Sequence, residues 1–235
     1  MDITHWELDM TITSSTLFRA TGAAAVVAGS IFIAVQVNHP PMEVSSVQTT
    51  EWVVRSCAKV VMSALALAGL TGIYLRQFRQ AGLLGLIGYL VFAAGYLGMF
   101  SVEVMAAALF PGLATIEPGY VDDVIVAAAG GAPAGDIGGM QTLLDLTGIG
   151  YLAGGLLFGI AVFRTGILAR WAAALLAVGT VGTAALAVLP EAFNRPLAVP
   201  VGVALVGLGA SLWRRHQESP AVPVSTDPVR ENAVR

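Results

Sequence analysis

Charged side chains are scarce in this sequence of 235 residues: Asp, Glu, Lys and Arg together make up 11% of it, against about 25% in soluble domains. Hydrophobic residues make up 56%, and the mean hydropathy is +0.78. So few charges cannot cover a soluble surface, and we therefore expect most of the surface to face lipid. The composition predicts an all-α integral membrane protein whose first partner is the lipid bilayer.

Cysteine and histidine are also rare. The single cysteine, Cys57, excludes an internal disulfide and a cysteine-based metal cluster. The histidines lie outside or at the ends of the apolar runs, so a haem held by histidines from the core is not expected. The basic residues form no cluster of the kind that nucleic acids require. We therefore expect no cofactor, no metal ion and no nucleic-acid partner. The three histidines are His5, His39 and His216.

Apolar segments close to the 20 residues that cross a bilayer occur six times, and proline-containing breaks follow several of them. We therefore expect a six-helix transmembrane domain over 17–213. It follows a cytoplasmic or interfacial N-terminal segment, 1–16, and precedes a disordered cytoplasmic tail, 214–235. The predicted spans are about 17–37, 53–75, 82–110, 141–163, 169–189 and 196–213.

The distribution of basic residues predicts the orientation, because short cytoplasmic loops carry an excess of Lys and Arg. Six spans place both termini on one side, with nine basic residues there and three on the other. The connection 111–140 is acidic and has no basic residue. We therefore expect both termini in the cytoplasm. The Ala-, Gly- and Arg-rich composition favours a bacterial protein, so the expected membrane is a bacterial plasma membrane. The nine are Arg19, Arg76, Arg79, Arg164, Arg170, Arg214, Arg215, Arg230 and Arg235, and the three are Arg55, Lys59 and Arg195.

Two features leave alternatives open. The stretch 121–135 is apolar but too short to cross a membrane, and it is either a short interfacial helix or a Gly/Ala/Pro linker. Glycines recur at helical spacing over 82–110 and 141–163, which lets helix backbones approach closely in lipid. They serve either packing within the chain or a homodimer through one of these two helices.

The segment Gly150-Tyr-Leu-Ala-Gly-Gly-Leu-Leu-Phe-Gly, followed by Phe163-Arg-Thr-Gly-Ile-Leu-Ala-Arg-Trp, resembles a bacterial family of small multi-pass membrane proteins of unknown function. That family often shows a similar glycine- and tyrosine-containing helix followed by a short inner turn. The resemblance covers about 35 residues. It implies about six helices and no known chemistry, so it transfers no functional residue.

Three ionisable residues lie inside the predicted spans: Lys59, Glu103 and Asp145. A charge at the bilayer centre costs about 2.5–3.5 kcal/mol on insertion scales, so such residues are functional candidates. At about 1.5 Å per residue, Lys59 and Glu103 lie roughly 10 Å below the outer surface, and Asp145 roughly 6 Å. One cation and two anions at similar depth are able to neutralise one another. The sequence leaves open whether they touch.

These three residues are also the candidate catalytic groups, and the candidate binding site extends to their neighbours. Arg55 and Lys59 share one helix face, Gln141 lies one turn before Asp145, and His39 follows the first span. The binding set is Arg55, Lys59, Glu103, Asp145, Gln141 and His39.

Three functions fit this pattern. The first is an outward-facing polar pocket that binds or moves a small molecule, a proton or a lipid. The second is an acid–base enzyme in the membrane that acts on a lipid or an isoprenoid, since two carboxylates and an amine suit proton transfer. The third is a scaffold in which the buried charges only hold helices together. Whether the protein is an enzyme stays open.

A reporter enzyme that is active only outside the cytoplasm tests the topology. Fused after Arg235 it is expected to be inactive, because nine basic residues on that side favour the cytoplasm. The same reporter inserted into the connection 111–140 should be active. An active fusion after Arg235 would contradict the predicted orientation.

Overall fold

The computed structural model describes residues 13–184 and 194–214, and within them the long regular elements are all α-helices. Residues 1–12, 185–193 and 215–235 lie outside the described part. The end of the expected span 169–189 is therefore among the residues that are not described. The helices are α1 (Ser14–Ala34), α2 (Val44–Val47), α3 (Thr50–Ala108), α4 (Phe110–Ile116), α5 (Pro118–Ala128), α6 (Gly139–Thr165), α7 (Arg170–Gly182) and α8 (Asn194–Arg214).

Helix α3 is a hairpin of two antiparallel arms. Backbone angles leave the helical region at Gln77 and again at Gly82, where φ is +57°, a conformation that favours glycine because it has no Cβ. Thr71 and Tyr89 then face each other across the hairpin, with their hydroxyl oxygens 2.9 Å apart. The chain therefore turns back between the expected spans 53–75 and 82–110. The first arm is 50–76 and the second arm is 83–108.

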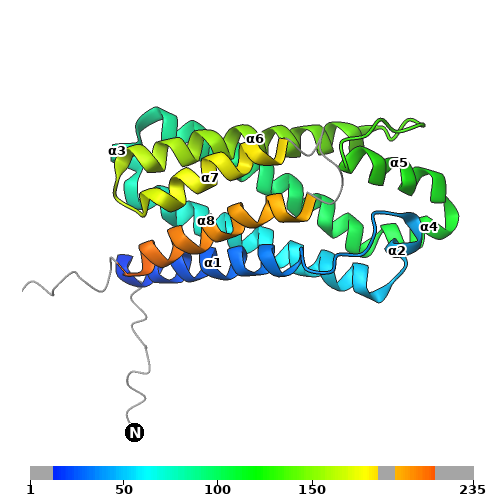
Figure 1. The fold of residues 1–235 in the computed structure, drawn as a ribbon, viewed down its shortest axis with the longest axis horizontal. Helices are drawn as coiled ribbons and strands as arrows, with labels where there is room; N and C mark the ends of the chain where they lie inside the picture. The colour runs from blue at the N-terminus through cyan, green and yellow to red at the C-terminus, as the bar shows by residue number, and fades with distance from the viewer. Residues whose placement is uncertain (1–12, 185–193, 215–235) are drawn as a thin grey trace, which may run out of the picture.

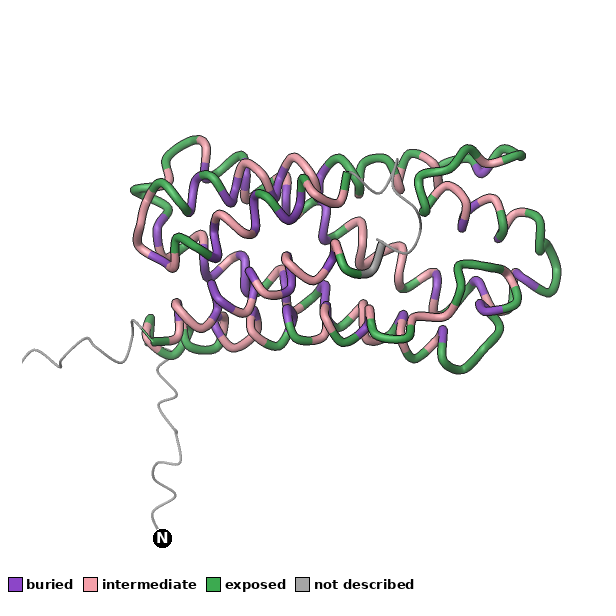
Figure 2. The backbone as a smooth tube through the Cα atoms, viewed as in Figure 1, coloured by how far each residue is buried: buried purple, intermediate pink, exposed green. Residues whose placement is uncertain are grey.

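Six helical segments of the described chain form a closed ring. Helix α1 packs on the first arm and on α8, the second arm packs on α6, and α7 lies between α6 and α8. In Figure 1, α6 and α1 run along opposite long edges, α7 and α8 lie between them at the front, and α3 lies behind. Buried residues from all six segments fill the centre, as Figure 2 shows.

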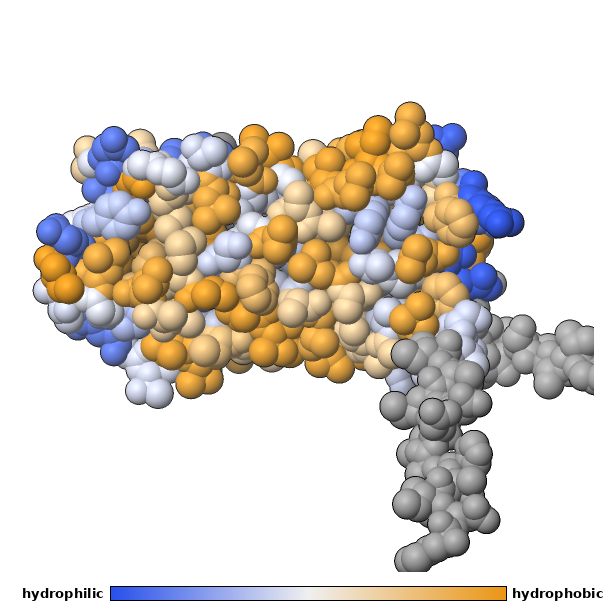
Figure 3. Space-filling view, turned by 180° about the vertical axis from the view of Figure 1, so that it is seen from behind, coloured by the Kyte–Doolittle hydropathy of each residue, from blue (hydrophilic) through white to orange (hydrophobic). Residues whose placement is uncertain are grey.

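The described residues contain four helices that are long and apolar enough to cross a membrane: α1, α3, α6 and the part of α8 from Pro196 to Arg214. Figure 3 shows the matching surface, with hydrophobic residues over the middle of the molecule and hydrophilic residues at its two ends. These features fit the expected all-helical membrane protein. Helix α7 has 13 residues in the described part, which is shorter than a full span.

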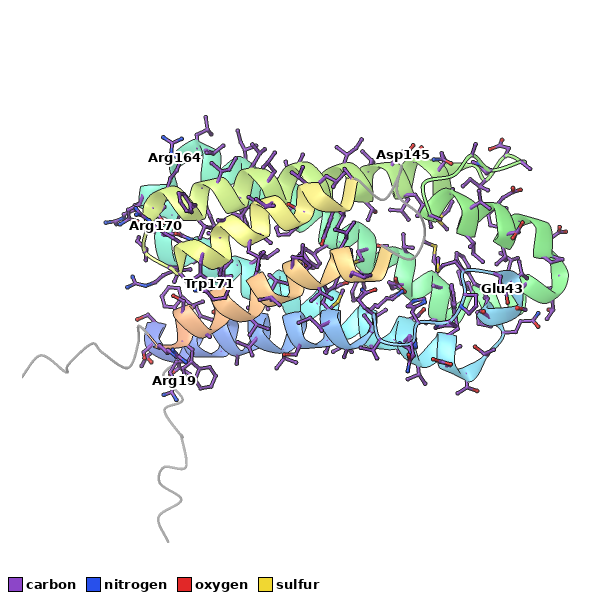
Figure 4. The ribbon with its side chains drawn as sticks, viewed as in Figure 1. Arg19, Glu43, Asp145, Arg164, Arg170 and Trp171 are labelled. Carbon is purple, nitrogen blue, oxygen red and sulfur yellow. The ribbon has the colours of Figure 1, made fainter. Side chains whose placement is uncertain are left out.

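The two ends of the bundle carry opposite charges. We call the end where α1 begins and α8 ends the basic end, and the opposite end, with α2, α4 and α5, the acidic end. Arg19, Arg164 and Arg170 lie toward the basic end in Figure 4, and Glu43 and Asp145 lie toward the acidic end.

A small second core closes the acidic end. It forms where α2, α4 and α5 meet the outer ends of both arms of α3. Helix α5 accounts for the first half of the stretch 121–135, and the second half is an irregular loop. The Asp123 carboxylate ties this loop to α5 by accepting hydrogen bonds from the backbone N–H groups of Ala134 (2.7 Å) and Gly135 (3.1 Å). The apolar stretch is thus half helix and half loop.

The glycines of the second arm and α6 allow these two helices to pack with their backbones in contact. A Cβ on Gly154 would meet the backbone of Phe92, and a Cβ on Gly95 would meet the backbone of Tyr151. On its other side α6 uses Gly159 in the same way against α7. These glycines therefore serve packing within the chain, where close contact replaces the hydrophobic driving force that lipid lacks.

Replacing Gly154 by alanine is expected to destabilise the protein by about 1–3 kcal/mol, because the added methyl group would overpack the contact with Phe92. Gly148→Ala on the same helix is the matched control, since no atom of a neighbouring helix lies within 4 Å of its Cβ position. Alanine there should leave stability unchanged or raise it by up to about 1 kcal/mol. Thermal unfolding in one detergent compares the two, and equal shifts would contradict the packing.

Candidate functional site

An ion pair joins the two arms of α3 near the acidic end. The Nζ atom of Lys59 on the first arm lies 3.0 Å from Oε1 of Glu103 on the second arm. The two side chains are 19% and 14% exposed, so each retains a little accessible surface. The contact that the sequence left open therefore exists for these two residues.

Helix geometry explains why both side chains point inward. Glu103 follows the buried Tyr96 by seven residues, and Lys59 precedes the buried Ala66 by seven. Seven residues turn a helix by about 700°, within about 20° of two full turns. Both charges therefore lie on the core-facing sides of their arms, at the outer end of the core.

Packed side chains close the site on its core side. Met62 and Ser63, about one turn deeper than Lys59, are 1% and 0% exposed. The Ser63 hydroxyl donates a hydrogen bond of 2.8 Å to the backbone carbonyl of Lys59 and so is satisfied within its own helix. The remaining accessible surface of the pair therefore does not open into the core.

Asp145 does not join this pair. Its side chain is exposed and accepts a hydrogen bond of 2.9 Å from Gln141 Nε2, one turn earlier on α6. No ion pair includes it in the part of the chain that the structure describes. Asp145 lies nine residues before Gly154, which is about 180° around the helix, and Gly154 faces the second arm. The carboxylate thus points away from α3.

Arg55 has a positioning role. Its guanidinium donates to the Glu51 carboxylate, at 2.7 Å for the shorter contact, and to the backbone carbonyls of Val35 (3.1 Å), Val37 (2.9 Å) and Asn38 (2.9 Å). These contacts use all five N–H donors of the side chain. Arg55 therefore holds the end of α1 against the first arm, and in this conformation it has no donor left for a ligand.

His39 belongs to the closure of the acidic end. Its Nδ1 lies 2.8 Å from the carbonyl oxygen of Pro40. The imidazole also packs edge-to-face on Trp52, with ring centroids 6.3 Å apart. Trp52 is itself buried and donates from Nε1 to the carbonyl of Ala106. His39 is therefore placed by aromatic packing at the outer ends of the arms.

Two tyrosines deeper in the core were missed by the sequence-based prediction. The hydroxyl oxygens of Tyr96 and Tyr151 are buried without a hydrogen-bond partner among the described residues, which is uncommon for buried polar groups. Their ring centroids lie 6.0 Å apart. The sequence contains a pattern that could have predicted the position of Tyr96: it stands seven residues before Glu103 in an apolar run, and therefore on the same helix face.

The ion pair predicts a specific pattern of stabilities. Lys59→Met should destabilise the protein by about 3 kcal/mol, because it leaves the nearly buried Glu103 carboxylate without its partner. The double variant Lys59→Met/Glu103→Gln should recover much of this loss. Thermal unfolding in detergent measures both, with Asp145→Asn as a control that should change little. If the single effects simply add, the two side chains do not interact.

The candidate site is thus one ion pair, Lys59 with Glu103, at the outer end of the core, with Arg55 holding the neighbouring helix end in place. Comparison with protein-family models, with curated proteins and with solved structures finds no match for this chain.

Proposed function

We propose that this protein crosses a bacterial plasma membrane six times, with both termini in the cytoplasm. The ring supplies the crossings: α1, the two arms of α3, α6, α7 and α8. The 59 residues of α3 would extend about 88 Å as one straight helix, far beyond a hydrocarbon core of about 30 Å, whereas each arm has the length of one crossing. Helix α7 is the described part of the fifth span.

The charges at the two ends support the orientation. Six described arginines lie at the basic end, and none of them forms an ion pair within the described residues. The two basic residues toward the acidic end, Arg55 and Lys59, are both engaged with glutamates. Unpaired positive charge therefore gathers where cytoplasmic loops are expected to have it. The six are Arg19, Arg76, Arg79, Arg164, Arg170 and Arg214.

We infer that Lys59 and Glu103 form an outward-facing polar site that binds or moves a small molecule, a proton or a lipid. The observation that carries this proposal is the position of the pair, which lies on the core-facing sides of two spans and stays partly exposed. The ammonium group has three donors, and the 3.0 Å contact with Glu103 uses one. The remaining donors suit an anionic or carbonyl group that arrives from the acidic end.

A packing clamp is the second candidate, because the pair directly joins two arms of one hairpin. In that case the charges only set the register of the arms, and the protein acts as a scaffold. The acid–base enzyme has less support. Asp145 points away from α3, so one carboxylate instead of two stands beside Lys59.

The double variant Lys59→Met/Glu103→Gln distinguishes binding from clamping, because it removes both charges together. We expect wild-type protein purified in mild detergent to retain a small molecule or lipid, detected by native mass spectrometry. The double variant should lose that molecule while it still unfolds cooperatively. Asp145→Asn should retain the molecule, because this variant removes a carboxylate at similar depth on the side of α6 that points away from α3. A double variant with unchanged contents would favour the clamp.

A further inference from the structure

Two surface grooves meet at the basic end of α8. One, of about 600 Å³, lies between α7 and α8, and the other, of about 410 Å³, lies between α1 and α8. We call them the α7–α8 groove and the α1–α8 groove. Both are lined by Ala210 and Arg214, so the two grooves flank one strip of α8 and converge at its last residue.

The α7–α8 groove has the length that an acyl chain requires, whereas the α1–α8 groove is shorter, because it follows α8 only from Ala210 to Arg214, about one turn. The α7–α8 groove follows α8 from Val203 to Arg214, eleven residues or about 16 Å. This is about half of a 30 Å hydrocarbon core, and so the depth of one leaflet. Apart from Arg214, the side chains that line it along α8 are small or aliphatic, with Ser211 the one hydroxyl. Ser211 is already occupied, since it accepts the N–H of Ala169 at 3.1 Å.

The point of convergence carries positive charge at headgroup level. Arg214 is exposed and makes no hydrogen bond or ion pair within the described residues. Trp171, which is 59% exposed, lines the α7–α8 groove, and Trp213 lines the other. The guanidinium carbon of Arg19 lies 5.4 Å from the Trp213 ring centroid. Figure 4 shows Arg19 and Trp171 at this same end. Tryptophans mark the headgroup region, and arginine binds phosphate in a bidentate manner.

We propose that these grooves bind one anionic diacyl phospholipid. One acyl chain lies along the α7–α8 groove, the other begins in the shorter α1–α8 groove, the two chains straddle Ala210, and the phosphate contacts Arg214. Charge complementarity identifies this occupant, because two exposed arginines stand at the mouth of two apolar grooves. The site is distant from Lys59 and Glu103 and does not depend on their role. It also holds in either orientation of the protein, because a leaflet adjoins each end.

A third groove provides an internal contrast. It lies between α6 and α7, has about 440 Å³, and is lined entirely by apolar residues such as Ile160 and Val178. No charged residue lines this groove, although the guanidinium carbon of Arg170 lies 5.7 Å from the ring centroid of Phe163, which does line it. With no arginine in its lining, the groove should show a weaker preference for anionic headgroups than the grooves beside α8. The proposal therefore predicts stronger headgroup selectivity at α8 than between α6 and α7.

Lipid-dependent thermal unfolding and native mass spectrometry of the full chain in detergent test the site. Phosphatidylglycerol should raise the unfolding temperature more than phosphatidylcholine with the same chains, and one molecule should stay bound. Arg214→Gln should weaken binding of phosphatidylglycerol about fivefold, the contribution of one basic residue near a membrane surface. Ala210→Phe should reduce binding of both lipids, because it fills both grooves.

Matched variants separate this site from general surface charge. Arg164→Gln removes an exposed arginine at the same end outside both grooves, and Val178→Phe narrows the α6–α7 groove instead. Neither should change the preference for phosphatidylglycerol. The proposal is overturned by equal effects of Arg164→Gln and Arg214→Gln, by equal stabilisation from both lipids, or by equal stabilisation from glycerol phosphate alone. Lipid-independent dimers that Ala210→Phe disrupts would likewise overturn it.

Discussion

The architecture depends on the break in the middle of α3. A backbone that stops being helical inside an apolar bundle exposes hydrogen-bonding groups that lipid does not satisfy. Here the break lies at the basic end, and Gln77 compensates for it. The side chain is 1% exposed; its amide donates to the carbonyl of Ile73, and its carbonyl accepts from the hydroxyl of Thr165. The Gln77 side chain thus gives a hydrogen bond to a backbone carbonyl at the end of the first arm and connects the turn to the end of α6.

Because the turn is held in place, the two arms run back along each other, and polar contacts between them mark their register. From the turn outward, the successive contacts are Thr71 with Tyr89, Lys59 with Glu103, and Trp52 with the carbonyl of Ala106. Glycines then set the distance to the neighbouring helices. The first arm approaches α1 through Gly69 and the second arm approaches α6 through Gly95. Small residues rather than large apolar ones therefore control how the ring closes, as expected where lipid competes equally for apolar surface.

The two ends of the ring offer different chemistry. At the acidic end a second small core and the contacts of Arg55 hold the outer ends of the helices together, and the Lys59–Glu103 pair stays partly accessible above the main core. At the basic end, exposed arginines and tryptophans surround grooves that continue into the apolar middle. These differences are the basis for proposing a polar ligand at the first end and a lipid at the second.

Much of this arrangement can be predicted from the sequence, because it depends on the composition of each segment and on the number of residues between positions. The apolar segments, their helical structure, the excess of arginine at one end and the similar depth of three charges are all of this kind. Depth could be calculated because a helix rises by a constant amount per residue. In the structure Thr147 lies against Gly98. Glu103 is five residues from Gly98 toward the acidic end and Asp145 is two residues from Thr147 in the same direction, so their levels differ by about 4.5 Å, less than one turn.

The rotation of each helix about its axis was decided only by tertiary packing. Lys59 shares a helix face with the buried Ala66, and Glu103 shares one with the buried Tyr96. The two charges meet because both faces point into the core. Asp145, at similar depth, faces outward because the glycines on the opposite side of α6 allow the closest approach to α3. Hydrophobic periodicity reveals little of this rotation in a membrane helix, since the lipid-facing and core-facing sides are both apolar. Close packing is what distinguishes the two sides, and it exists only once the helices have assembled.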